Sequence, residues 1–427
     1  MSCESSAARA NHCFRLGCAF RATRLVALLS TKQCVRRRHF GGGKMSSVTP
    51  TAVARAGRPP AARPGEPTAY NGRPIAAGVG SFRHPVSPRA SVADLWSTME
   101  IAAAAGETAL QKTGALSLDA PAKLRLSAYV QQARQYYEAA IRAEPIAKPL
   151  LGYYFVLNTT KAYLTLRDHP STVTPGIKHG IGQENGRLVG QYDFSQEHLQ
   201  IQQDGVFHLL ARSSGRGHVW SPGIMQISRL IPYLNESVDL YASAFNKRPS
   251  LIPIENTYIR ASGKRPNRLA WLVVEVSRLA LREADLSPRK LLDEAAAFAK
   301  SFDHVESDRD DVVKYESKPA VPYSAMPLAL PGLREAFDRS LISRNRTLAH
   351  PRDNIVLSPH LGLLSAEALT FAVMLHLSNM VRYRPHHVEQ LRGSSQWWLF
   401  TSWVDRACEN FLLAMSSRIS LEEHLIE

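Results

Sequence analysis

The sequence predicts a predominantly helical α+β protein, with a helical bundle built from its N- and C-terminal helices and a small antiparallel sheet region between them. Three observations lead to this prediction. Apolar residues recur at helical spacing near both ends of the chain. Short segments in which apolar and polar residues alternate, bounded by turn residues, occupy the middle of the chain. The sequence has no internal repeat of the kind that would indicate a solenoid. We therefore expect one elaborated domain over residues 91–427, preceded by a leader over residues 1–90.

Basic charge is concentrated in this leader. Residues 1–90 carry 15 Lys and Arg against two acids, whereas residues 91–427 carry 37 basic and 35 acidic residues. Residues 1–44 are rich in Arg, Ala and Ser, as organellar transit peptides are; the other interpretation is a start assigned too early, with Met45 as the true start. The proline-rich residues 46–90 are predicted to be disordered. The nearly neutral body argues against bulk attraction to nucleic acid.

Three helices are predicted at the start of the body. Ser91–Asp94 has the pattern of a capping box. Asp119 precedes a second helix, whose first turn contains Pro121. Pro149 opens a third over Leu150–Leu166, which is apolar nearly all round. We expect this third helix to be central, buried and packed against the C-terminal helices.

The middle of the chain is predicted to contain both strands and helices. Strands are predicted at 186–194 and 198–212, the second folded by a hairpin turn at Gln203–Gly205. Further predicted strands cover 271–276, 312–315 and 354–357. Helical segments are expected at 223–230, 236–245, 287–300 and 331–340.

The C-terminal part returns to long helices. They are predicted at 365–383 and 396–415, and the second carries an aromatic stripe that includes Trp397, Phe400 and Phe411. Core packing explains such a stripe better than a cofactor site does.

Several classes of site are disfavoured. The body contains one cysteine, Cys408, so it can form no internal disulfide and fits a reducing, cytoplasmic location. No Cys/His spacing suggests zinc, and no dinucleotide or phosphate loop is present. No apolar run approaches the roughly 20 residues that span a bilayer. We expect neither metal nor cofactor, and no membrane association.

One segment suggests chemistry. Arg344 and His350 stand six residues apart, with Asn345 directly after the arginine and Pro351 after the histidine. Histidine can transfer a proton near neutral pH, and arginine can hold a scissile phosphate, so the pair suits metal-independent RNA cleavage. The segment resembles the Arg-polar-x(3–5)-His motif of the HEPN superfamily, many of whose members are ribonucleases that act as homodimers. The alternative interpretation is that both residues cap and pin a loop.

Other polar residues are candidates for binding. Arg382 and Arg384 end a helix, where they either contact phosphate or complement the helix dipole. His179, followed by Gly180, is either a functional histidine near Lys161 or part of a helix-capping turn.

A wider resemblance covers residues 92 to 420. Four landmarks carry it: the segment Pro149–Leu164, the pair His179-Gly180, the segment Gly205–Phe207 and the segment Met380–Pro385. Together they resemble the YaaC-like family. The resemblance implies a shared fold and a cytoplasmic location and supplies no reaction. Two functions stay open: a protein-interaction or regulatory module with a protein partner, and a HEPN-like ribonuclease or RNA-binding protein. Whether the chain is an enzyme stays open with them.

Overall fold

The computed structural model describes residues 59–67, 69–70, 73–74, 89–105, 118–167, 174, 176–183, 192–193, 196–213, 223–262, 268–318, 320–322, 333, 342–345, 352–357, 364–420 and 425–426. All of them belong to one compact unit, Gly57–Glu427. The strand expected at 186–194 and the helix expected at 331–340 lie almost entirely outside the described residues.

The predicted α+β fold, predominantly helical, is confirmed, and its first three helices begin where expected. They are α1 (Val92–Ala105), α2 (Ala120–Arg142) and α3 (Lys148–Arg167). Ser91 caps α1 reciprocally with Asp94, because the amide of each donates to the side chain of the other, at 2.8 and 3.2 Å. The Asp119 carboxylate accepts from the amide of Ala122 at 2.7 Å and so caps α2.

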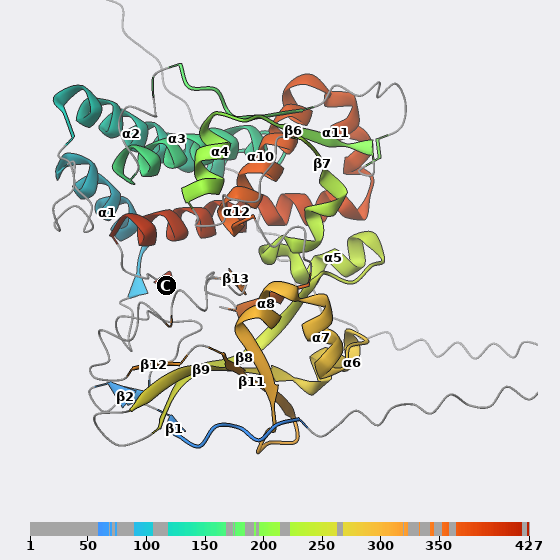
Figure 1. Ribbon diagram of the computed structural model, residues 1–427. Coiled ribbons are helices and arrows are strands. Elements are labelled where there is room, and N and C mark those ends of the chain that lie inside the picture. Colours follow the sequence, from blue (N-terminus) through green and yellow to red (C-terminus); the bar gives the residue numbers. More distant parts are fainter. Residues whose placement is uncertain are drawn as a thin grey trace, which may run out of the picture. The chain divides into compact units, whose positions relative to one another are not determined.

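The C-terminal helices complete the bundle. They are α10 (Ala366–Tyr383), α11 (Pro385–Arg392) and α12 (Ser395–Ser420). As expected, α3 is central: it packs against α2, α10 and α12 (Figure 1). None of the helices in the described ranges has the length and apolar character needed to cross a membrane.

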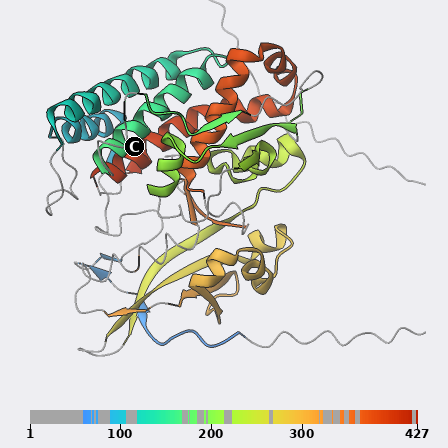
Figure 2. The ribbon, with the colours of Figure 1, turned by 45° about the horizontal axis from the view of Figure 1, so that its top comes forward.

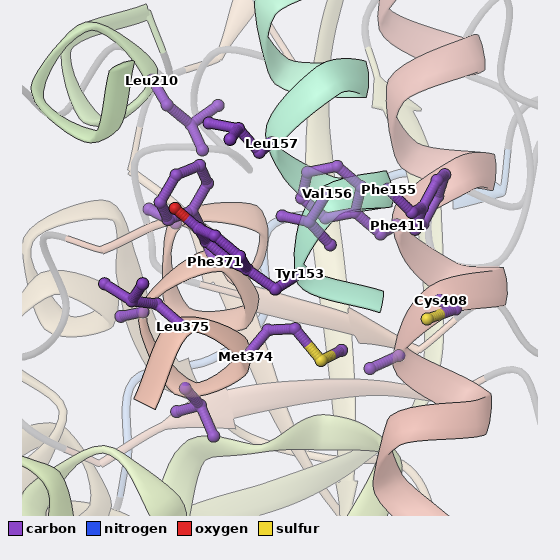
Figure 3. Packing of buried hydrophobic residues seen from close by; sticks show 14 of the residues in the cluster. Tyr153, Phe155, Val156, Leu157, Leu210, Phe371, Met374, Leu375, Cys408 and Phe411 are labelled. Atoms are coloured by element: carbon purple, nitrogen blue, oxygen red, sulfur yellow. The ribbon is translucent and has the colours of Figure 1, made fainter. Parts of the chain in front are cut away.

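The centre of the bundle is densely packed. Tyr153 and Phe371 meet edge to face with ring centroids 5.8 Å apart, and both are fully buried (Figure 3). At Gly152, an added Cβ would lie 3.2 Å from the sulfur atoms of both Met374 and Cys408. Because interiors tolerate little extra volume, this glycine lets α3 approach α10 and α12 closely.

A second layer is an antiparallel sheet, which lies apart from the bundle helices in both views (Figure 1, Figure 2). The described strands form an eight-stranded sheet whose main order is β10-β11-β9-β8-β14-β13. Two short strands extend it, β1 along β8 and β12 along β9. The bounds are β1 (Glu66–Pro67), β8 (Leu251–Ser262), β9 (Leu269–Ser277), β10 (Phe302–Val305), β11 (Val312–Ser317), β12 (Val321–Pro322), β13 (Ile342–Asn345) and β14 (Arg352–Val356).

One face of this sheet buries its own hydrophobic cluster. Leu272 and Val274 of β9 lie on it, with Tyr315 of β11 beside them. The cluster is covered by three short helices, which contribute Leu281, Leu291 and Phe298: α6 (Arg278–Glu283), α7 (Pro288–Glu294) and α8 (Ala296–Ser301).

Small elements connect the two layers. A three-stranded sheet consists of β5 (Ile181–Gln183), β6 (His198–Ile201) and β7 (Gly223–Gln226). Between and after its strands come α4 (Val206–Ala211), α5 (Val238–Phe245), and the 3-10 helices η5 (Ile227–Arg229), η6 (Ile231–Tyr233) and η7 (Asn235–Ser237). Short pairs are formed by β2 (Ala69–Tyr70) with β3 (Arg73–Pro74), and by β4 (Arg89–Ala90) with β15 (Leu425–Ile426).

Three local predictions are wrong. A hairpin was expected at 198–212, but the strand ends at Ile201 and residues 206–211 form the helix α4. In α4, the buried residues Val206, Phe207 and Leu210 recur at helical spacing. The helix expected at 223–230 is the strand β7 followed by η5. The single helix expected at 287–300 is broken at Ala295, which leaves the helical region at φ −109° and ψ 64°.

The structure also differs from the prediction in the leader. Residues 59–67, within the segment predicted to be disordered, lie along the sheet, and β1 pairs with β8 through Glu66–Ala261 and Pro67–Arg260. Composition suggested disorder because the segment is rich in proline and short of apolar residues. The contacts that hold it are polar and come from distant parts of the chain.

Candidate functional site

A loop shaped by two glycines carries His179. Gly180 has a φ of 77° and Gly205 a φ of 107°, both in the region that favours glycine. The two backbones touch: a Cβ added to Gly205 would lie 2.5 Å from the amide nitrogen of Gly180. Any larger residue at Gly205 would therefore push the His179 loop away.

The same loop caps a helix. The amides of Val206 and Phe207, the first residues of α4, donate to the carbonyls of Lys178 and His179, each at 2.9 Å. As the first amides of the helix they have no acceptors within it, and the loop supplies acceptors instead. The capping turn considered from the sequence is present in this form, and it also fixes the backbone of His179.

The imidazole of His179 is held by a buried tyrosine. Its Nδ1 lies 2.6 Å from the Tyr153 hydroxyl, and the two share a hydrogen bond. Burial raises the pKa of Tyr153 far above its usual value, so the phenol stays neutral. No residue in the described ranges bonds to Nε2 of His179, which lies on the opposite side of the ring. The ring is oriented from one side and can meet a ligand from the other.

Two cations lie close to this histidine. Burial lowers the pKa of His179, and the charges of Lys161 and Arg382 lower it further. Burial also lowers the pKa of Lys161. Arg382 donates to the Tyr154 hydroxyl at 3.1 Å and to the side-chain oxygen of Asn379 at 3.0 Å. Within the described part of the chain, neither cation forms an ion pair with a carboxylate, and the buried Nε of Arg382 has no partner. We call Lys161, His179 and Arg382 the basic site.

Aromatic rings surround the basic site. The Lys161 ammonium lies 5.4 Å from the centre of the Tyr129 ring. The Arg382 guanidinium lies 4.8 Å from the centre of the Tyr383 ring and 6.0 Å from that of Tyr154. Tyr154 stacks on Tyr136 with centroids 5.1 Å apart. Cation–π contacts stabilise the charges in place without neutralising them.

This arrangement has a clear chemical capacity. Lysine and arginine without paired carboxylates attract an anion, and their partial burial strengthens the attraction. Arginine presents donors that suit phosphate, while a neutral histidine can donate or accept a further hydrogen bond. A phosphoryl group with an aromatic substituent matches these features.

Arg384, although two residues from Arg382, faces a different environment. It donates from both terminal nitrogens to the Glu197 carboxylate, at 2.6 and 3.0 Å. The Glu197 side chain is fully buried, and it also accepts from Gln183 at 2.6 Å. The structure thus places Arg384 in an internal ion pair, outside the basic site.

His376 adjoins that ion pair. Its Nδ1 lies 3.3 Å from the Gln183 amide nitrogen and its Nε2 lies 3.2 Å from the Tyr192 hydroxyl. Burial, with a smaller contribution from Arg384, lowers the pKa of His376 to about 3. Glu197 is 3.7 Å away, but Arg384 already balances its charge.

Acidification is expected to destabilise the fold through His376. Its pKa is about 3 when folded and 6.5 ordinarily, so between these values the unfolded chain binds a proton that the folded chain does not. The free energy of unfolding therefore falls as pH drops below 6.5, by about 1.4 kcal/mol per pH unit. Urea denaturation at pH 7 and pH 5 should show a loss about 2 kcal/mol smaller in His376→Gln than in the wild type. Equal losses would contradict this assignment.

Comparison with known proteins identifies the family. The family model described as YaaC-like Protein matches residues 109–419. The chain belongs to the YaaC-like family. Searches of curated proteins and of solved structures found no match. In this YaaC-like chain the basic site is built entirely from residues inside the matched range.

The pair Arg344 and His350 is placed only in part. In the YaaC-like chain Arg344 and Asn345 lie on β13, where they pair with Asp353 and Arg352 of β14. His350 lies outside the described residues. The segment expected from the HEPN resemblance thus enters a strand of the sheet, whereas the basic site lies on α3, α10 and the loop before β5.

Sequence reasoning singled out each member of the basic site and missed most of their surroundings. The structure brings Lys161, His179 and Arg382 together and separates Arg384 from them. Tyr154 lies in the segment Pro149–Leu164 that the sequence analysis singled out, and it stands seven residues before Lys161, so it shares the same helix face. Asn379 had no comparable signal. No group of His, Cys, Asp and Glu able to hold a metal occurs within the part of the chain that the structure describes.

Proposed function

We propose that this YaaC-like protein is a cytoplasmic regulatory module that binds a phosphate-bearing ligand at the basic site. The observation that carries the proposal is the pair of partly buried cations, Lys161 and Arg382, beside a histidine whose pKa is lowered. Burying a cation is unfavourable when no counter-ion accompanies it. A bound phosphoryl group would be that counter-ion.

The surrounding rings favour a nucleotide as the ligand. Tyr383 is 68% exposed and lies over Arg382, so its free face can stack on a base. Stacking on an aromatic ring contributes roughly 1–3 kcal/mol per base in single-stranded nucleic acid. The ligand is either a free nucleoside monophosphate or the phosphorylated end of an RNA, which share this chemistry. Ligand binding at α3 and α10 could then be reported to a protein partner that contacts the same helices.

Truncating either cation is expected to weaken nucleotide binding. A hydrogen bond to a charged group contributes about 1.5–3 kcal/mol, so Lys161→Ala and Arg382→Ala should each raise Kd roughly 10–100-fold. Isothermal titration calorimetry at low salt with adenosine 5′-monophosphate measures this. Arg289→Ala removes the same charge from an exposed position on α7 and should leave Kd unchanged. Adenosine, which lacks the phosphate, should not bind; equal affinity for both compounds would overturn the proposal.

A second experiment separates binding from RNA cleavage. A 5′-phosphorylated RNA oligonucleotide incubated with the protein and a metal chelator should be bound and remain intact. Cleavage that His350→Ala abolishes and His179→Ala preserves would replace this proposal with ribonuclease activity by Arg344 and His350. That alternative rests on the general capacity of an Arg–His pair for metal-independent phosphodiester cleavage.

A further inference from the structure

A second surface of the protein is already occupied by a peptide, and that peptide belongs to the chain itself. We call residues Pro59–Pro67 the strap. It runs along the sheet face opposite the hydrophobic cluster, with β1 beside β8 (Figure 1). The amide of Glu306 donates to the carbonyl of Pro60 at 2.9 Å. No strap residue is fully buried, so the strap lies on the surface like a bound ligand.

The strap lays one half-buried side chain, Arg63, against the sheet. The guanidinium donates to the Glu316 carboxylate at 3.0 Å and to the carbonyl of Ser317 at 2.5 Å. The Arg63 amide also donates to Glu316, at 3.2 Å. The flat face of the guanidinium lies 4.7 Å from the centre of the Trp271 ring. A carboxylate, a carbonyl and an indole together make a site selective for arginine.

The sheet surface also restricts which residues can follow Arg63. A Cβ added to Gly65 would lie 2.6 Å from a ring carbon of Trp271 and 2.9 Å from the carbonyl of Ala261, so the surface admits only glycine there. The carbonyl of Gly65 accepts a hydrogen bond from Arg260. The surface therefore recognises an extended Arg-Pro-Gly sequence. Proline favours this extended conformation before binding and lowers the entropy lost on docking.

The strap leaves some buried polar atoms of this sheet face without hydrogen-bond partners. Glu316 is the strap's main anchor, and its side chain is 2% exposed, yet its second carboxylate oxygen has no partner among the described residues. The same holds for the indole nitrogen of Trp271 and for Nε of Arg260. Buried polar atoms without partners are unfavourable. A peptide that satisfied them would bind better than the strap does.

We propose that this sheet face is a binding surface for an extended Arg-Pro-Gly segment of a partner protein, and that the strap occupies it as a tethered competitor. The proposal uses no residue of the basic site, so it stands or falls independently of nucleotide binding. A tether holds its ligand at an effective concentration in the millimolar range. A partner segment must therefore displace the strap, and weakening the strap should free this binding surface.

The test measures binding of a fluorescent synthetic peptide with the sequence of residues 57–68 to full-length protein. Arg63→Ala should bind this peptide at least about tenfold more tightly than the wild type, because its own strap competes less. A peptide in which alanine replaces Arg63 and Arg58 is kept should not bind, and adding Glu316→Gln to Arg63→Ala should abolish binding. Arg134→Ala removes an exposed arginine from α2 and should behave as the wild type does. If Arg63→Ala binds the peptide no more tightly than the wild type does, the proposed binding surface is refuted.

A measurement on the unaltered protein guards against loss of folding in the variants. Hydrogen–deuterium exchange of the strap amides, including the Arg63 amide bonded to Glu316, should speed up when excess unlabelled peptide is added. The matching peptide with alanine in place of Arg63 should leave exchange unchanged. If strap exchange is insensitive to both peptides, the strap is a fixed structural element and the proposal fails.

Discussion

Arg384→Ala is expected to destabilise the protein by roughly 3–5 kcal/mol, the cost of leaving a buried charge without its partner. The charge is that of Glu197, whose side chain is fully buried and receives two hydrogen bonds from Arg384. The remaining donor, Gln183, cannot neutralise a carboxylate. Urea denaturation monitored by circular dichroism would measure the change in the free energy of unfolding.

Two further variants isolate the cause. Arg392→Ala breaks an exposed pair with Glu389 at 3.1 Å and should cost less than about 1 kcal/mol. Combining Arg384→Met with Glu197→Gln removes both charges and should recover part of the loss. If Arg384→Ala and Arg392→Ala destabilise the protein equally, the Glu197 ion pair is not the reason.

Gly205→Ala should be the second severe change, with an expected loss of roughly 3 kcal/mol. Alanine at a φ of 107° is strained, and its Cβ would meet the Gly180 backbone at 2.5 Å, where no flexible side chain can give way. Because the clash displaces the loop that carries His179, the variant should also bind nucleotide more weakly.

Gly182→Ala, two residues from Gly180, is the matched control. A Cβ at Gly182 meets no atom within 4 Å, so the variant should change stability by at most about 0.5 kcal/mol. Thermal denaturation of both variants, followed by nucleotide titration, tests the pair. A stable Gly205→Ala protein with normal affinity would show that the two backbones can separate without consequence.

The helical part of the fold was predictable because its signals are local. Ser91, Asp119 and Ser365 each precede a helix and accept hydrogen bonds from its first turn. The apolar sequence of α3 correctly indicated a central helix, since only a helix packed on several sides can bury such a surface.

The sheet was harder to predict because its stability comes from pairing between distant segments. The longest of the described strands, β8, went unrecognised. Its sequence Leu251–Ser262 contains Pro253, and polar and apolar residues alternate imperfectly around a register shift between Ile254 and Asn256. Proline in a strand is expected only at edges or irregularities. The sequence alone could not show that β14 and β1 would each pair with one end of β8.

In the basic site, too, the individual residues could be predicted from the sequence and their arrangement could not. His179 and Arg382 could be named individually, since His179 precedes a glycine and Arg382 lies in the last turn of a helix. Lys161 was named only as a companion of His179, because it lies inside α3. Their convergence could not be predicted, because it depends on how α10 crosses α3. The separation of Arg384 from Arg382 had no sequence signal either, as it requires the buried carboxylate of Glu197.

The contact between Arg63 and Glu316 spans 253 residues of sequence, which has a consequence for how the protein is made. At a synthesis rate of about 5–20 residues per second, the strap emerges from the ribosome roughly 13–50 s before the strand that contains Glu316. Throughout that interval the strap of the nascent chain has no Glu316 with which Arg63 can pair. Chaperones and other factors that act on nascent chains thus meet Arg63 without the ion pair that holds it in the folded protein.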